Sequence, residues 1–289
     1  MSPTLAMIEG LGHVGQVARV RLAQSIIGYL ALWAMLAMHA ELWAAIATPL
    51  AAVCVTGYWI RHHGTAPATF ARRIESADHR IHWRTDIFPF QWRIALSWIS
   101  GYFMYNLFTP MAFMHAGPVA AGQLGLGLTI FSAVSTVGMS WVNARTPRLA
   151  SLIGLGDRIA LNREFRTVAV RSSVATALLA AVVVAGVQFL GVLQVPVAAR
   201  LAPPWAMAFL AWTTSVNAVI FAMASYMRAH KEEPLLTMSL VSGALTLGIA
   251  WLTSHWSVTW MCGGYALVTT VVTLPWTCLL YRRYVLRPR

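Results

Sequence analysis

Residues 88–148, FPFQWRIALSWISGYFMYNLFTPMAFMHAGPVAAGQLGLGLTIFSAVSTVGMSWVNARTPR, decide how the rest of the chain is interpreted. Two apolar runs, 94–114 and 118–142, are separated only by the turn HAGP at 115–118. Each run is long enough to cross a hydrocarbon layer of ~30 Å. The stretch therefore predicts a transmembrane hairpin.

Each arm of this hairpin carries one polar stripe at helical spacing. The stripe of the first arm consists of Trp98, Tyr102, Tyr105, Asn106 and Thr109, and that of the second arm consists of Thr129, Ser132, Thr136, Ser140 and Asn143. In lipid such stripes would lack hydrogen-bonding partners. We therefore expect them to face other helices or a water-filled cavity.

The composition of the 289-residue chain indicates a polytopic helical membrane protein. Of its residues 58% are apolar and only 10% are charged, so a soluble domain would have too little polar surface to cover itself. The net charge of +12 is compatible with nucleic-acid binding. However, the basic residues lie in short loops between apolar runs, so membrane topology explains the charge better and no nucleic-acid partner is expected.

The apolar runs predict an all-α bundle of eight transmembrane helices. The predicted spans are 22–40, 42–60, 94–114, 118–142, 170–193, 204–226, 235–254 and 258–281. Positive charge accumulates in cytoplasmic loops, and all of the 21 Lys and Arg residues except Arg200 fall on one side of this arrangement. Both termini are therefore expected to be cytoplasmic.

The segment 61–93 is the one long connection between predicted spans. Phe70, Ile74 and Ile81 share a helical face opposite a cluster of charged residues, which predicts an amphipathic helix lying on the cytoplasmic leaflet. The alternative is an ordinary solvated linker.

The run from FPFQWR (88–93) through HAGPVAAGQLGLGL (115–128) to NARTPRLASLIGLGD (143–157) resembles the opening hairpin of the C-terminal lobe in polysaccharide flippases. These proteins are the lipid-linked oligosaccharide translocases of the multidrug/oligosaccharidyl-lipid/polysaccharide exporter superfamily. The resemblance implies two six-helix lobes that rock against each other around a central cavity.

On that plan, residues 9–30 resemble the start of the fifth family helix, so the first four helices are missing. The resemblance then implies three parts: the end of the first lobe at 1–60, a cytoplasmic amphipathic linker at 61–93, and a six-helix second lobe at 94–289. Either the chain is a truncated member, or a second chain or a dimer completes the transport cavity.

The sequence offers little for catalysis, cofactors or metal ions. There is no H-E-x-x-H or G-x-S-x-G motif and no pair of aspartates for a magnesium diphosphate, so an enzyme is not expected. All nine acidic residues fall in loops or at helix ends, which disfavours ion-coupled export. The adjacent His62 and His63 point to different helical faces, and the three cysteines lack metal spacing and are expected to be small core residues.

Arginines and neutral polar residues are the candidate binding groups. Given the resemblance, Arg145 and Arg171, together with Arg93, are candidates for attracting the diphosphate of a polyprenyl-linked sugar; the alternative for Arg171 is snorkelling to headgroups. The candidates for a sugar-accepting cavity are Tyr102, Tyr105, Asn106, Thr136, Asn143 and Asn217. The alternative is that these residues join helices through hydrogen bonds of ~0.6 kcal/mol each.

The resemblance implies a flippase of surface polysaccharide biosynthesis in the bacterial cytoplasmic (inner) membrane, which needs membrane lipid and a lipid-linked oligosaccharide as partners. Two alternatives remain open. The chain could be a non-transporting scaffold of a polysaccharide export complex, or a drug/cation antiporter of the same superfamily.

Overall fold

The computed structural model describes the chain except for residues 1–4, 6–7, 9–13, 63–81, 231–233 and 287–289. Every regular element in the described ranges is helical, so the predicted all-α class is confirmed. Seven of these helices are long and apolar enough to cross a membrane. The chain divides into two compact units, Met1–Ile81 and His82–Arg289. The boundary falls within 61–93, and the amphipathic helix predicted there lies outside the described residues.

The first unit is a pair of packed helices. Its elements are α2 (Val14–Ala37), the short 3-10 helix η1 (Glu41–Ile46) and α3 (Ala47–His62). The amide of Gln24 on α2 donates a hydrogen bond of 2.6 Å to the hydroxyl of Thr56 on α3. Trp33 and Trp43, on either side of the turn between the helices, are each about 70% exposed, as expected for aromatic residues at a membrane interface.

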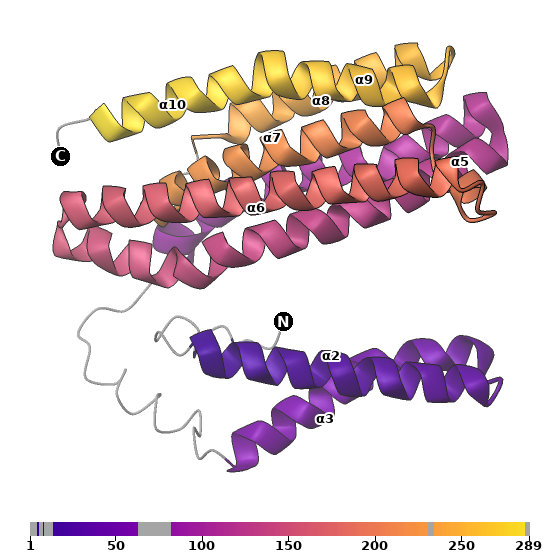
Figure 1. Cartoon of the computed structure of the whole chain (residues 1–289). Helices are drawn as coiled ribbons and strands as arrows, with labels where there is room; N and C mark the ends of the chain where they lie inside the picture. The colour runs from indigo at the N-terminus through magenta and orange to yellow at the C-terminus, as the bar shows by residue number, and fades with distance from the viewer. Residues whose placement is uncertain (1–4, 6–7, 9–13, 63–81, 231–233, 287–289) are drawn as a thin grey trace. The chain divides into compact units, whose positions relative to one another are not determined.

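The second unit is a bundle in which successive helices run back and forth (Figure 1). Its elements are η2 (Trp83–Ile87), α5 (Phe88–Leu155), α6 (Arg158–Val192), η3 (Ala198–Arg200), α7 (Pro204–Ala229), α8 (Leu236–Ser254), α9 (Val258–Val268), η4 (Thr269–Thr273) and α10 (Leu274–Leu286). The connections α6–α7 and α8–α9 lie at one end of this bundle (Figure 1). The α5–α6 turn and the end of α10 lie at the other end.

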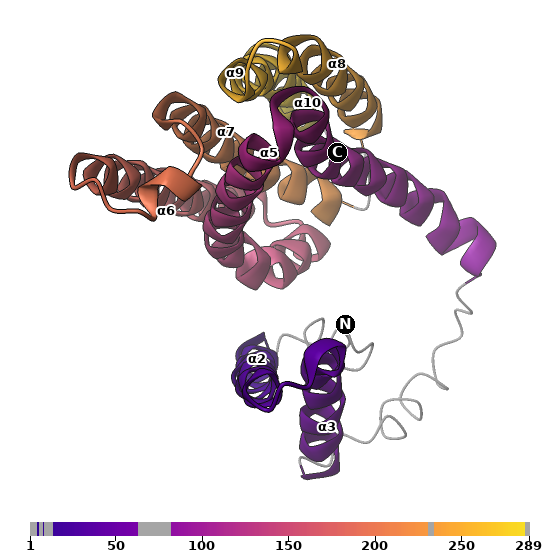
Figure 2. The ribbon, with the colours of Figure 1, turned by 90° about the vertical axis from the view of Figure 1, so that its right-hand side faces the viewer.

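The long element α5 is two helical arms joined at Gly117. This residue has φ +85° and ψ 175° and is followed by Pro118, so the helical path is interrupted where the sequence predicts the turn. Near the turn the arms touch, because a Cβ added at Gly125 would lie 3.7 Å from Thr109 Oγ1. Away from the turn the arms splay apart (Figure 2). The predicted hairpin is therefore present.

Gly117→Ala is expected to lower the free energy of unfolding by about 1–3 kcal/mol, because its backbone lies in a region that residues with a Cβ scarcely populate. No atom lies within 4 Å of the added Cβ, so the loss reports backbone strain and not a clash. The matched control is Gly122→Ala, which lies in open space inside a helix and should stabilise by about 0.5–1 kcal/mol. Denaturation of the two variants in detergent measures their free energies of unfolding. A Gly117→Ala chain as stable as the parent would contradict the predicted backbone strain.

The helices at the arginine-rich end are longer than predicted. The region 143–169, predicted as a loop between spans, is helical except for the turn at Gly156 and Asp157. Gly156 ends α5 in a left-handed conformation with φ +73°, and the Asp157 carboxylate accepts a hydrogen bond from the Ala160 amide and caps α6. The 35 residues of α6 span about 52 Å, which exceeds a hydrocarbon core of ~30 Å.

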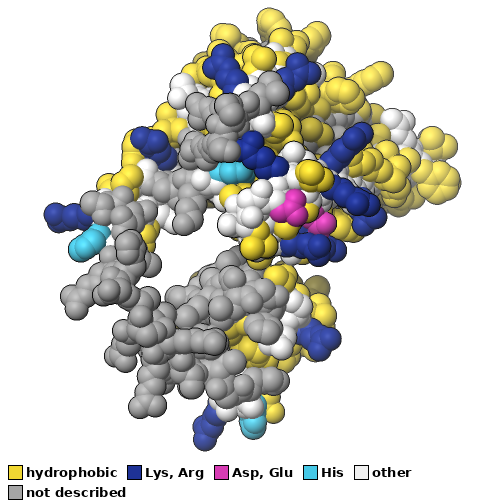
Figure 3. Space-filling view, turned by 90° about the vertical axis from the view of Figure 1, so that its left-hand side faces the viewer, with side chains coloured by type: hydrophobic (Ala, Val, Ile, Leu, Met, Phe, Trp, Pro, Cys, Tyr) yellow, Lys and Arg dark blue, Asp and Glu magenta, His cyan; other side chains and the backbone are white. Residues whose placement is uncertain are grey.

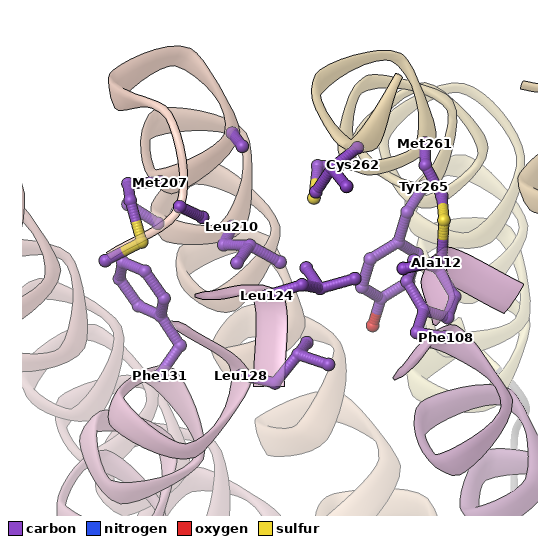
Figure 4. Packing of buried hydrophobic residues seen from close by; sticks show 14 of the residues in the cluster. Phe108, Ala112, Leu124, Leu128, Phe131, Met207, Leu210, Met261, Cys262 and Tyr265 are labelled. Carbon is purple, nitrogen blue, oxygen red and sulfur yellow. The ribbon is translucent and has the colours of Figure 1, made fainter. Parts of the chain in front are cut away.

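The interior of the second unit is filled by apolar side chains from α5, α7 and α9 (Figure 4). Phe108, Leu124 and Phe131 of α5 are at most 2% exposed and belong to one cluster with Met207 of α7 and Tyr265 of α9. Many large apolar side chains also lie on the outer surface, among them Phe113, Leu178 and Trp251. A helical unit that is apolar both inside and outside fits a lipid environment.

Candidate functional site

The polar stripe of the second arm of α5 lies on the surface of the second unit. We call it the α5 stripe; its residues are Thr129, Ser132, Thr136, Ser140 and Asn143, and all five are exposed. The hydroxyl of Thr136 donates to the Ser132 carbonyl oxygen at 2.9 Å, and that of Ser140 donates to the Val137 carbonyl oxygen at 2.6 Å. These local bonds use the hydroxyl protons and leave oxygen lone pairs facing outward.

On the first arm, Tyr102 and Asn106 are also exposed, whereas Tyr105 turns inward. The Asn106 amide donates to the Tyr102 carbonyl oxygen at 2.9 Å, and the Tyr102 side chain is 64% exposed. Tyr105 packs edge-on against the ring of Tyr265, with centroids 6.4 Å apart. Of the predicted lining residues on this arm, two are therefore on the surface and one belongs to the packed interior.

Asn217 lies away from the surface stripe, in the middle of α7. Its amide donates a hydrogen bond of 3.0 Å to the Tyr265 hydroxyl, and it lines a small pocket bounded by α5, α7, α8 and α9 together with η4. The structure thus links Asn217 and Tyr105 through Tyr265.

The predicted arginines lie where α5 and α6 extend toward their connecting turn. Arg145 Nη1 contacts Glu164 Oε1 at 3.0 Å, and Arg148 Nε lies 3.9 Å from the same oxygen. Two guanidinium groups share one carboxylate, so this corner keeps a net positive charge. The Arg145 side chain is 49% exposed, and an exposed pair of this kind contributes about 1 kcal/mol or less.

The other two predicted arginines lie outside this ion pair. Arg171 is exposed on α6, and the Arg93 guanidinium lies 5.8 Å from the centroid of the neighbouring Trp92 ring. The space-filling view of this end shows Lys and Arg gathered over it, with few acidic groups among them (Figure 3). Sequence reasoning identified these arginines but missed Glu164 as the partner of Arg145, because the two are 19 residues apart on different helices.

Sequence reasoning also missed most of the hydroxyl groups around Asn217. Ser239, Ser242 and Thr246 recur every three or four residues along α8 and line the same pocket. That spacing indicates that the three residues share one helical face. The pocket-lining serines of α5 could not be predicted in this way, because Ser97 and Ser100 lie off the polar stripe that contains Tyr102.

A groove of about 690 Å³ lies between α6 and α7. It is lined mainly by alanine and other apolar side chains, with Gln188 and Ser215 as its polar members. Such a groove suits hydrocarbon and offers few partners to a sugar. It is therefore distinct from the candidate polar sites.

Within the described ranges, no group of three or more His, Cys, Asp or Glu side chains could hold a metal ion. His62 packs on the ring of Tyr58 with centroids 4.3 Å apart, while His63 lies outside the described residues. Cys262 is buried, as expected for a small core residue. The same expectation is wrong for Cys54, which is exposed on α3, because α3 turns part of its apolar face outward.

Comparisons of the chain with protein-family models, curated proteins and solved structures find no match. The features of this chain that bear on its function are therefore the α5 stripe, the arginine-rich end and the polar pocket.

Proposed function

We propose that the chain is a multi-pass protein of the bacterial cytoplasmic membrane that moves a lipid-linked oligosaccharide from the cytoplasmic to the outer leaflet. The proposed topology has eight crossings with both termini in the cytoplasm. It is supported by the seven span-length helices and by the interruption at Gly117, which divides α5 into two arms. The arginines at the end where α5 meets α6 support a cytoplasmic assignment of that end.

The observation that carries the proposal is the exposed α5 stripe. A row of hydroxyl and amide groups on a membrane helix is poorly solvated by lipid, so its exposure in this unit calls for water or another protein surface beside it. Ser132, Thr136 and Asn143 are neutral; the Thr136 hydroxyl offers lone pairs as acceptors, and the Asn143 amide can both donate and accept. This chemistry suits the hydroxyl groups of a carbohydrate better than an ion or an apolar drug.

The arginine-rich end supplies the complement for the other part of the proposed substrate. A polyprenyl diphosphate carries its negative charge at the cytoplasmic headgroup level, where Arg145 and Arg148 share Glu164 and retain net positive charge. Guanidinium groups bind phosphate oxygens in bidentate geometry. The resemblance to polysaccharide flippases agrees with both features.

A cavity for an oligosaccharide needs a second wall opposite the α5 stripe. We propose that another copy of this chain provides it, so that the purified chain can form the cavity by itself. The alternative functions named from the sequence are a scaffold of an export complex and a drug/cation antiporter; the lack of charge along the stripe favours the flippase over the antiporter.

Translocation in liposomes tests the function. The purified full chain should accelerate the appearance of a labelled polyprenyl-diphosphate oligosaccharide in the opposite leaflet, measured by its accessibility to an added glycosidase. Replacing Thr136 and Asn143 together by Leu should abolish most of this rate, because the wall facing the sugar becomes apolar. Leu178→Ala, on the exposed apolar face of α6, is the control and should leave the rate unchanged. No acceleration by the parent chain would overturn the proposal and favour the scaffold.

A further inference from the structure

A small polar pocket lies inside the second unit, separate from the α5 stripe. We call it the hydroxyl pocket; its volume is about 150 Å³. Its principal polar lining residues are Ser97 and Ser100 on α5, Asn217 on α7, Ser242 and Thr246 on α8, and Thr269 in η4. None of its lining side chains is charged. The pocket therefore offers hydroxyl and amide groups without an ionic partner.

The hydroxyl pocket reaches from the middle of α7 to the first two turns of α8, where Ser239 and Ser242 lie. Asn217 is close to the centre of α7 (Pro204–Ala229), and Thr269 lies between α9 and α10 within the span Val258–Val285. At this depth water is scarce, so a group of polar side chains needs a structural or functional reason. Substrate sites of transporters commonly lie at this level.

One hydroxyl of the pocket lacks a partner among the described residues. Ser242 is only 6% exposed, and its buried Oγ makes no hydrogen bond within that part of the chain. A buried hydroxyl without a partner costs free energy, and an unfilled hydrogen bond of this kind points to a ligand or an ordered water.

Asn217 and Tyr265 leave further hydrogen-bonding capacity beside Ser242. The Asn217 amide uses one N–H to donate to the Tyr265 hydroxyl oxygen at 3.0 Å. The second N–H and the carbonyl oxygen of Asn217 are not used by this bond, nor is the hydroxyl proton of Tyr265. Donors and acceptors thus occur together in the pocket.

Hydrogen bonds hold α5 and α8 together at the pocket. Ser97 Oγ and Ser239 Oγ are 2.9 Å apart, and Ser100 Oγ donates to the Ser239 carbonyl oxygen at 3.1 Å. A Cβ added at Gly243 would collide with Ser100 Oγ, so α5 and α8 approach closely here. The π-helix η4 also lines the pocket, and such a distortion is frequent at functional sites.

From this geometry we propose that the hydroxyl pocket binds one uncharged sugar ring. Each sugar hydroxyl both donates and accepts, which matches a lining of serine, threonine and asparagine. A divalent cation such as Ca²⁺ would require oxygen ligands with more negative charge than this lining supplies, and an alkyl chain would leave Ser242 unpaired. The site is distinct from the α5 stripe, so sugar binding here does not depend on lipid translocation.

Saturation-transfer NMR on the purified full chain in nanodiscs tests the proposal, with galactose and N-acetylglucosamine as neutral probes and glucuronate and glucosamine as charged ones. The neutral sugars should bind with millimolar dissociation constants and the charged ones much more weakly. Ser242→Ala should weaken neutral-sugar binding about two- to tenfold, the loss expected for one neutral hydrogen bond. Asn217→Leu should weaken it at least as much.

Ser225→Ala is the matched control, because Ser225 is a buried serine on α7 whose hydroxyl donates to the Phe221 carbonyl oxygen outside the pocket. It should bind the probes like the parent. Ser242→Ala removes an unpaired buried hydroxyl, so its melting temperature should be equal to or above that of the parent, which keeps the test valid if Asn217→Leu fails to fold. Absence of saturable neutral-sugar binding, or unchanged binding by Ser242→Ala, overturns the proposal and leaves a pocket that holds water alone.

Discussion

Gly138→Leu is expected to lower the free energy of unfolding of the chain by about 3 kcal/mol, the upper range for inserting a side chain into a packed interface. Gly138 lies where the second arm of α5 crosses α6. A Cβ at this position would collide with the Thr176 hydroxyl and would lie 3.1 Å from Thr176 Cβ. The Gly138 carbonyl oxygen also accepts a hydrogen bond of 2.8 Å from Ser172 Oγ. Separating the helices would break that bond as well as the contact.

Two controls assign this loss to the helix contact. Gly186→Leu, also in a helix but with nothing within 4 Å of the added Cβ, should be neutral or stabilising. Thr176→Ala removes the hydroxyl that meets the new side chain, so adding it to Gly138→Ala should restore most of the stability that Gly138→Ala alone removes. Denaturation in mixed micelles measures both. Equal losses for the leucine variants at Gly138 and Gly186, or additive effects of the alanine substitutions, would contradict the account.

Close approach at a small residue matters here because lipid provides little hydrophobic force between helices. The contact at Gly138 keeps the second arm of α5 against α6, and the α5 stripe occupies an exposed face of the same arm. A variant that opens the contact should therefore disturb translocation as well as stability. This consequence connects the packing of the second unit with the proposed function.

The helical class and the α5 hairpin could be predicted from sequence because both depend on local signals. Long apolar runs specify helices in a membrane, and Gly117 followed by Pro118 interrupts a helix by its backbone geometry alone. Predicted and observed bounds agree closely for α7 and α8. These elements needed no information about tertiary contacts.

The ends of α5 and α6 could not be placed by hydropathy, because the helices continue past the apolar segments. Arginine is a good helix former, and Asp157 caps α6 at its first turn. The arginines of the region 143–169 mark the end of a membrane span, which is a different boundary from the end of a helix. Only the turn at Gly156 follows from local sequence.

The candidate binding residues also depend on tertiary contacts that local sequence does not specify. The exposure of Thr136 and Asn143 depends on how the arm packs against α6 and α7, and the sequence left open whether they face a cavity or another helix. The hydroxyl pocket depends on four separate segments meeting, so Ser242 could not be distinguished from an ordinary helix-joining serine. Its unpaired hydroxyl is visible only in three dimensions.

Cysteine accessibility tests most directly the central claim that the α5 stripe faces water inside a membrane. Single cysteines would replace Ser132 and Thr136 on the stripe, and Leu178 and Val182 on the exposed apolar face of α6, in a chain whose own cysteines are alanine. The contact of Gly138 with Ser172 and Thr176 places the two pairs at similar depth.

In intact lipid vesicles, a membrane-impermeant maleimide should modify the Ser132 and Thr136 positions at least about tenfold faster than the Leu178 and Val182 positions, because only a hydrated thiol ionises to the reactive thiolate. All four chains should elute as folded protein by size-exclusion chromatography, so that the rates compare like with like. Equally slow modification at all four positions would show that lipid or tightly packed protein covers the stripe, and it would contradict the account.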